Sequence, residues 1–113
     1  MWSDRYHYFN IYSDEELTSS IKTAEIRNFL LCFKELKQKS DFNFKNQIDF
    51  PFTDITLLNA KSFNSWSNRD TDENTTNLIS IVCVKDNIED LKKLTNLFNE
   101  ITIFLDWRLV EED

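Results

Sequence analysis

The strongest constraint on the fold of this chain is one uninterrupted apolar run, Leu78–Val84, in the second half of the sequence. Four of its seven residues are β-branched, none is charged, and polar residues stand on both sides of it. An apolar run of strand length between polar residues is typical of a strand that is buried on both faces. We therefore expect Leu78–Val84 to be a central strand of a sheet.

Three further segments alternate apolar and polar residues, as strands with one buried face do. These segments are Tyr6–Tyr12, Thr53–Lys61 and Thr102–Val110. Ser40–Phe52 also contains alternating aromatic residues, and it fits either a short edge strand or a loop. Pro51 argues against a central strand at that point, because proline cannot donate a hydrogen bond to a neighbouring strand.

Two segments predict helices. The first begins at Ser13, which forms the Ser-x-x-Glu pattern of a capping box with Glu16, and we expect this helix to extend to about Lys39. The second begins after Asn87, a favourable N-cap residue, and shows one apolar stripe at helical spacing. That stripe consists of Ile88, Leu91, Leu94, Phe98 and Ile101.

The resulting order of elements is strand, helix, strand, strand, helix, strand. This is the β-α-β-β-α-β order of ferredoxin-like folds, which are α+β proteins with an antiparallel sheet and two helices on one face. The chain has 113 residues and a single proline, so we expect one domain over residues 1–113. In this arrangement Tyr6, Tyr8 and Tyr12 would lie on the open face of the sheet.

The sequence contains no glycine, which excludes phosphate-binding loops, dinucleotide-binding turns and hydrolase nucleophile elbows. The acidic segment around Asp70 lacks the glycine of a calcium-binding loop, and Cys32 and Cys83 lack the spacing of a zinc site. The only histidine, His7, lies in an aromatic strand, where a structural role is favoured over catalysis. We therefore expect no enzymatic activity, no cofactor and no metal.

The cysteines and the hydropathy pattern indicate a reducing compartment. Cys32 and Cys83 each lie in an apolar run, which favours buried free thiols, although a single disulfide between them stays open. The first residues lack the apolar core of a signal peptide, and no segment reaches the length of a membrane span. We expect a cytoplasmic protein without a membrane partner.

The charge of the chain is strongly acidic and uneven. Twenty Asp and Glu residues stand against thirteen Lys and Arg residues, for a net charge of −7, and residues 51–113 carry −6 of it. Such a surface repels phosphate backbones and attracts basic proteins. Leu78–Val84 also lacks the aromatic, basic and glycine residues that RNA-recognition modules carry on their third strand. We expect a basic protein partner and no nucleic acid.

Aromatic and arginine residues beside acids have the composition of a surface that binds a basic protein. Two segments have this composition, one around Trp66 and one at the C-terminal end after Trp107. For Trp107 we favour a place in the core, whereas Trp66 fits a binding residue and a loop anchor equally well. The predicted partner-binding residues are Trp66, Arg69, Asp70, Asp72, Glu73, Glu111, Glu112 and Asp113.

In this profile the chain resembles the small acidic immunity proteins of bacterial toxin–immunity pairs, especially those of contact-dependent growth inhibition systems. The resemblance rests on the short chain, the net charge of −7, the absence of catalytic motifs and polar loops such as Ser67–Glu73. These families share no short motif, so no residue role is carried over. The resemblance implies a stoichiometric inhibitor that covers the active site of one basic toxin, often a nuclease, with an acidic face.

A different class of function is also compatible with the expected fold. Ferredoxin-like domains often dimerise and bind metabolites between subunits, so the chain also fits a small-molecule-binding regulatory module. This alternative predicts a homodimer, together with a thermal shift on adding a metabolite in the absence of any basic protein.

Overall fold

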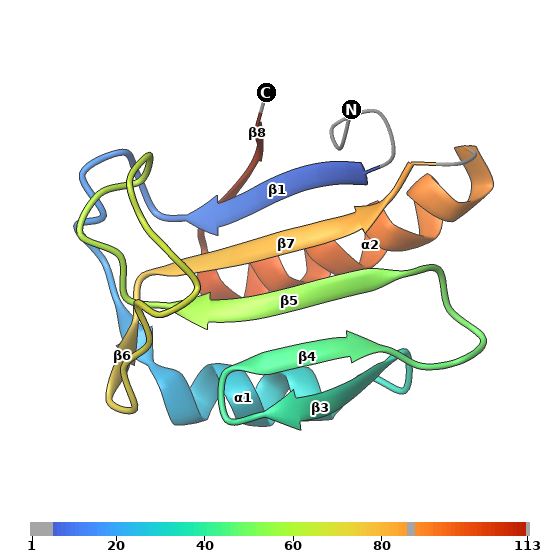
Figure 1. The fold of residues 1–113 in the computed structure, drawn as a ribbon, viewed down its shortest axis with the longest axis horizontal. Coiled ribbons are helices and arrows are strands. Elements are labelled where there is room, and N and C mark those ends of the chain that lie inside the picture. Colours follow the sequence, from blue (N-terminus) through green and yellow to red (C-terminus); the bar gives the residue numbers. More distant parts are fainter. Residues whose placement is uncertain (1–5, 86–87, 113) are drawn as a thin grey trace.

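The computed structural model describes residues 6–85 and 88–112 (Figure 1). In these residues six strands form one sheet in the order β3-β4-β5-β7-β1-β8, and all neighbouring strands are antiparallel. These strands are β1 Tyr6–Tyr12, β3 Leu36–Ser40, β4 Asn43–Asn46, β5 Thr53–Leu58, β7 Leu78–Val84 and β8 Arg108–Glu112. The other elements are the helices α1 Thr23–Leu31 and α2 Ile88–Leu105 and the two short paired strands β2 Ile21–Lys22 and β6 Thr75–Thr76.

β7 is a central strand, as its apolar sequence predicts. It pairs with β5 on one side and with β1 on the other, and five of its seven residues are buried. Side chains on both of its faces are covered, which explains why the strand is apolar throughout instead of alternating.

The main core lies between the sheet and the two helices, which both lie behind the sheet in Figure 1. α1 contributes Ile26 and Leu30 to this core, and the strands contribute one face each. The residues from α2 are Leu94, Leu97, Phe98, Ile101 and Leu105. The chain is therefore an α+β protein with two helices and a mostly antiparallel sheet, and this part of the predicted fold is confirmed.

The predicted start of the first helix is wrong. α1 begins at Thr23, and residues 13–20 form a loop that the Asp14 carboxylate closes. This carboxylate accepts hydrogen bonds from the backbone N–H groups of Glu16 and Thr18 and from the Thr18 hydroxyl. The capping-box pattern misleads here because short polar side chains accept backbone N–H groups in loops as readily as at helix starts.

The predicted end of that helix is also wrong. α1 ends at Leu31, and the residues near Lys39 belong to β3 instead. β3 pairs with β4, and this hairpin adds two strands beyond β5. Ser40–Phe52, which fitted a strand or a loop, contains β4 followed by a loop with Pro51.

The last predicted strand begins too early. α2 continues to Leu105, and β8 begins only at Arg108. Asp106 has a φ of 57°, in the left-handed region, and reverses the chain between them. Ile103, which the predicted strand would place on one face with Trp107 and Leu109, is 79% exposed, and Ile88 of the predicted stripe is 72% exposed. The predicted cap Asn87 lies outside the described residues.

The face opposite the helices is only partly open. Tyr12, predicted on the open face, is buried in a second, smaller core that we call the small cluster: Tyr12, Leu58, Ala60 and Leu78. Three partly buried side chains from two loops pack against it, namely Leu17, Phe63 and Trp66. Tyr6 and Tyr8 are half-buried at the other end of β1.

Both cysteines are free. Cys83 is buried, as predicted, whereas Cys32 is exposed because it directly follows the last turn of α1. Neither helix in the described part of the chain is long and apolar enough to cross a membrane.

Candidate partner-binding surface

Five of the predicted binding residues lie in the loop 59–74, which connects β5 to β6 (Figure 1). Trp66 is half-buried and packs against the small cluster, so it anchors the loop to the sheet. Arg69 and Glu73 are exposed, and Asp70 and Asp72 are half-buried. The sequence left the role of Trp66 open; its contact with the small cluster now gives it a structural role.

The two half-buried acids give the loop its shape. Asp70 accepts a hydrogen bond of 2.9 Å from the backbone N–H of Ser67. Asp72 accepts hydrogen bonds from the backbone N–H groups of Asn74 and Thr75. Each carboxylate accepts hydrogen bonds from backbone N–H groups a few residues away, so these hydrogen bonds hold the loop 59–74 in its closed shape.

The loop is also tied to the chain that enters α1. The buried Thr23 hydroxyl donates a hydrogen bond of 2.8 Å to the backbone carbonyl of Asp72 and lies 2.8 Å from the Thr76 hydroxyl. The Thr23 N–H donates to the carbonyl of Asn74 at 3.1 Å. These contacts extend the pairing of β2 with β6, so they fix the loop 59–74 relative to α1.

A second acidic loop lies at the same end of the sheet. Leu17 of the loop 13–20 packs against the small cluster, as do Phe63 and Trp66 of the loop 59–74, and the two loops lie side by side in Figure 1. Together they carry six acids and two bases. We call their acids the acidic end: Asp14, Glu15, Glu16, Asp70, Asp72 and Glu73.

Three of these acids were missing from the predicted site. A helix that begins at Ser13 would hold Asp14, Glu15 and Glu16 in its first turn, where acids complement the helix dipole. Hydrogen bonds from Thr18 to Asp14 lower the pKa of that carboxyl below its ordinary value. The carboxylate that closes the loop is therefore ionised at neutral pH.

The predicted acids near the C-terminus lie on two different faces of β8. Glu112 stands opposite Tyr8 on the face away from the helices and accepts a hydrogen bond of 3.3 Å from Asn10. Glu111 lies on the helix face, with its Oε2 2.8 Å from Nδ1 of His7. Asp113 lies outside the described residues. Tyr12 belongs to the small cluster, against which both acidic loops pack. The residue of β8 opposite Tyr12 is Arg108, the first of the strand. Glu111 and Glu112 are therefore separated from the acidic end by most of the strand.

Trp107 is buried in the main core, as favoured from the sequence. It therefore takes no part in the candidate surface.

Cys83, His7 and Glu111 follow one another across three neighbouring strands. Their order of thiol, imidazole and carboxylate is that of the catalytic triad in cysteine hydrolases. Cys83 is the neighbour of His7 on β7, and Glu111 is its hydrogen-bond partner from β8. Burial, with a contribution from Glu111, raises the pKa of the Cys83 thiol to about 12. The thiol is therefore protonated at neutral pH and is not an activated nucleophile.

The described residues contain no group of three or more His, Cys, Asp or Glu side chains that could hold a metal.

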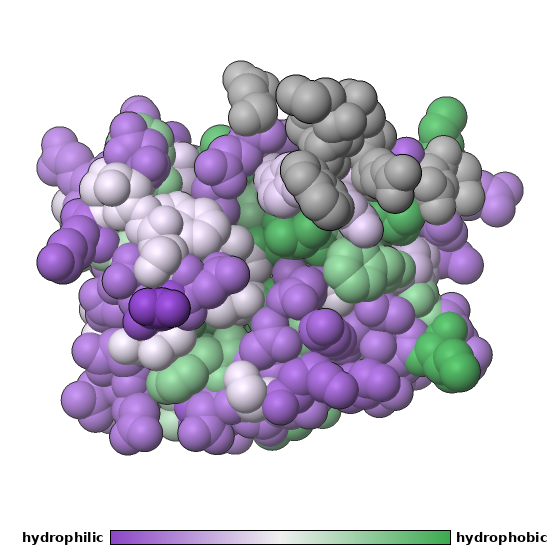
Figure 2. Space-filling model, in the orientation of Figure 1, coloured by the Kyte–Doolittle hydropathy of each residue, from purple (hydrophilic) through white to green (hydrophobic). Residues whose placement is uncertain are grey.

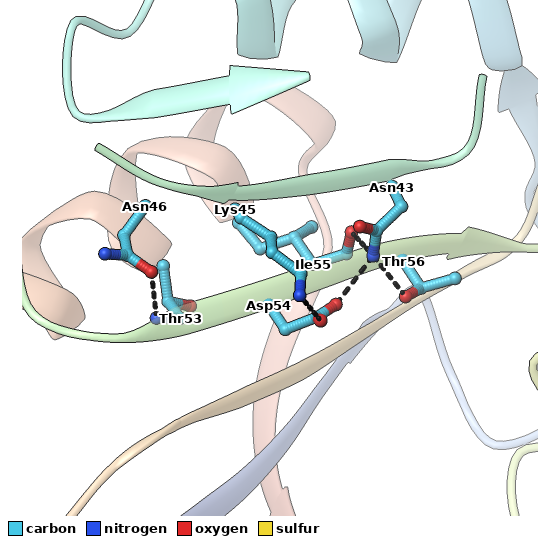
Figure 3. Close-up of polar contacts among 7 residues, drawn as sticks. All are labelled: Asn43, Lys45, Asn46, Thr53, Asp54, Ile55 and Thr56. Carbon is cyan, nitrogen blue, oxygen red and sulfur yellow. Dashed lines mark hydrogen bonds and ion pairs between the residues drawn. The ribbon is translucent and has the colours of Figure 1, made fainter. Parts of the chain in front are cut away.

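On β4 and β5 the sheet face away from the helices is polar, and its polar side chains contact one another. Figure 2 shows mainly hydrophilic residues in front of β3 to β5, with apolar patches toward the centre and at the lower left of the view. Figure 3 shows Asn43 of β4 donating to Asp54 at 2.6 Å and to Thr56 at 3.1 Å, with Lys45 3.7 Å from the same Asp54 carboxyl group. The Asp54 carboxylate thus joins β4 to β5.

A separate cleft of about 720 Å³ lies between α2 and the loops that follow α1 and β4. Its lining combines both charges with apolar side chains: Lys34, Lys93, Asp49, Glu100, Phe50 and Leu97. Among the predicted binding residues that the structure describes, none lines this cleft.

Comparison of the chain with protein-family models, with curated proteins and with solved structures gives no significant match.

Proposed function

We propose that this protein is a stoichiometric inhibitor that binds a basic bacterial toxin through its acidic end, as immunity proteins do. The observation that carries the proposal is the meeting of the loops 13–20 and 59–74 at one end of the sheet. A nuclease is the toxin class that fits best. Nuclease clefts are basic because they bind phosphate, so an acidic surface can occupy the same subsites.

The order of the two loops supports a binding role. Asp14 closes one loop, and Asp70 and Asp72 close the other through backbone hydrogen bonds. A surface that is already ordered loses little conformational entropy on association. Its clustered negative charge accelerates encounter with a basic partner and disfavours acidic ones.

We also propose a fold type and a location. The strands β5-β7-β1-β8 and the two helices would form a ferredoxin-like core, and the β3–β4 hairpin would be an addition to it. An inhibitor of a toxin that acts inside the cell would work in the cytoplasm.

The test is affinity purification of the tagged protein from the cells that encode it, at low and at high salt. The variant Glu15→Gln/Glu16→Gln/Glu73→Gln removes three exposed charges from the acidic end. The matched control Asp49→Asn/Glu89→Gln/Glu100→Gln removes three exposed charges elsewhere.

We expect the wild type and the control to retain one basic protein in stoichiometric amount, and the acidic-end variant to lose it. Nuclease inhibition by the wild type would then identify the reaction. Equal capture by both variants, or no basic partner at all, would contradict the proposal.

The cleft beside α2 supports a second candidate, a small-molecule-binding regulatory module. Its volume of about 720 Å³ lies in the range of ligand pockets, and its lysines and acids face a common space. A metabolite that raises the Tm of the wild type, but not of Lys93→Glu, would support this function. A metabolite set that shifts neither protein would count against it.

A further inference from the structure

The large sheet ends in two edge strands, β3 and β8. The outer edge of an edge strand presents backbone N–H and C=O groups that can pair with another strand, and proteins commonly protect such edges. Within the described residues, β3 and β8 each pair with a strand on one side only. The two edges differ in how they are protected.

β3 carries two protective features. Lys37 and Lys39 are both exposed, and the pairing with β4 shifts its register between Gln38 and Ser40. If two copies of β3 paired antiparallel about Gln38, Lys37 of one copy would stand opposite Lys39 of the other. Both the irregular backbone and the like charges disfavour pairing at this edge.

β8 has neither feature. All five of its residues pair with β1 in an unbroken register, and it contains no proline and no lysine. Arg108, Glu111 and Glu112 are exposed, and Leu109 and Val110 are half-buried. This edge is regular, so it can accept a further strand.

The sequence of β8 is complementary to itself. In an antiparallel pair of two β8 strands centred on Val110, Arg108 of each copy stands opposite Glu112 of the other. Arg108, Val110 and Glu112 lie on the same face of the sheet, because they stand opposite Tyr12, Asn10 and Tyr8 of β1. The pair thus forms two symmetric Arg–Glu contacts around a central Val–Val contact, and such cross-strand pairs stabilise a sheet.

Other registers lose the two Arg–Glu contacts. A shift of two residues in one direction sets Glu111 opposite Glu111 of the second copy, and a shift of two in the other direction sets Arg108 opposite Val110 and leaves Glu112 beyond the end of the facing strand. Registers of odd shift would place residues of opposite faces against each other. The charge pattern therefore selects the register centred on Val110.

We propose that two copies of this chain associate through antiparallel pairing of their β8 strands about Val110, which joins the two sheets across a two-fold axis. The inference is independent of the proposed toxin inhibition, since it requires no other protein. The contact between two five-residue strands is small, so we expect the dimer to be weak and dependent on concentration.

The test uses two charge reversals, Arg108→Glu and Glu112→Arg, with sedimentation analysis of purified protein. Wild type is expected to dimerise at roughly 100 μM, a concentration suited to a weak complex, and each single variant is expected to associate at least about tenfold more weakly. In each variant alone, both symmetric contacts become repulsive.

Mixing the two variants provides the decisive control. In the mixed pair the substituted position 108 of one chain, now acidic, faces the substituted position 112 of the other chain, now basic. The native Glu112 of the first chain meets the native Arg108 of the second, so both contacts are attractive again. We expect the equimolar mixture to recover the dimer, although each variant alone associates only weakly. This recovery also shows that both variants are folded, despite the loss of the native contacts of Arg108 with Tyr12 and of Glu112 with Asn10.

The reversal Lys92→Glu, at an exposed position of α2 away from both edge strands, serves as the matched control and should leave dimerisation unchanged. Three results would overturn the proposal: a wild type that stays monomeric, single reversals that do not weaken the dimer, or a mixture that fails to recover it. If the wild type is monomeric, the β8 edge is not a contact between two copies of this chain, and a strand from a different protein would be the remaining candidate to pair with it.

Discussion

The hydroxyl of Thr23 donates a hydrogen bond of 2.8 Å to the backbone carbonyl of Asp72, forty-nine residues later in the chain. Thr23 is the first residue of α1, and Asp72 lies in the loop 59–74. The contact is one of the few that fix this loop to the helix layer. The position of the acidic end therefore depends on a hydrogen bond from a residue outside it.

The variant Thr23→Val tests this link. Valine has nearly the same shape but no hydroxyl, so it leaves the Asp72 carbonyl and the buried Thr76 hydroxyl without this partner. We expect a loss of about 1–3 kcal/mol in the free energy of unfolding, measured by urea denaturation. Thr95→Val is the control, because the Thr95 hydroxyl bonds only to carbonyls of its own helix. Equal effects of the two substitutions would contradict the role of Thr23.

Ile101 and Ile103 test where α2 ends. Ile101 is fully buried and Ile103 is 79% exposed, as expected if α2 continues to Leu105. Ile101→Ala should cost about 2–5 kcal/mol, whereas Ile103→Ala should change stability by less than about 0.5 kcal/mol. Were the segment a strand from Thr102, Ile103 would face the core. A large loss for Ile103→Ala would therefore contradict a helix that extends to Leu105.

The two thiols should differ in reactivity. Cys32 is exposed, whereas Cys83 is buried with a pKa of about 12. Iodoacetamide at neutral pH should label Cys32 in the native protein and should reach Cys83 only after unfolding, because the thiolate is the reactive species. Peptide mass spectrometry distinguishes the two sites. Rapid labelling of Cys83 in the native state would show that β7 is not buried as described.

Asp14 predicts a pH dependence of the loop 13–20. Its pKa is lowered in the folded state by hydrogen bonds from Thr18, so its contribution to stability is complete above the unfolded pKa of about 3.8 and is lost as pH falls through the folded value. Asp14→Asn should therefore destabilise the protein at pH 7, with a difference from wild type that shrinks below about pH 3.8. Urea denaturation across this range measures the difference. A constant difference would contradict this role of the carboxylate.

The strands with clear patterns could be predicted from the sequence. Leu78–Val84 is apolar because both of its faces are covered, and Tyr6–Tyr12 alternates because one face meets the helices. These patterns record burial directly, so they identify the strands without knowledge of their partners. The burial of Trp107 followed from the same reasoning.

The helix boundaries could not be predicted in the same way. Leu36 lies at a helical spacing from Phe29 and Phe33, yet it belongs to β3. At the other boundary, Ile103 and Leu105 continue the alternation of Trp107 and Leu109 although both lie in α2. Over a few residues the two periodicities overlap, and local spacing alone cannot separate a helix end from a strand start.

The acidic end was only half predicted. The loop 59–74 is recognisable from its composition, but the sequence pattern attributes Asp14, Glu15 and Glu16 to a helix start. Their place beside that loop depends on β2 and β6, which pair through two residues each. Strands of this length leave no periodic signal, so their pairing was not visible in the sequence.

The central claim is that the acidic end binds a basic protein. The most direct measurement is the Kd of the captured partner for the wild type, for Glu15→Gln/Glu16→Gln/Glu73→Gln and for the control Asp49→Asn/Glu89→Gln/Glu100→Gln, over a range of salt concentrations. We predict that the acidic-end variant binds at least about tenfold more weakly than the control at low salt, with the difference shrinking as salt screens the charges. Equal affinities for the two variants at every salt concentration would contradict the claim.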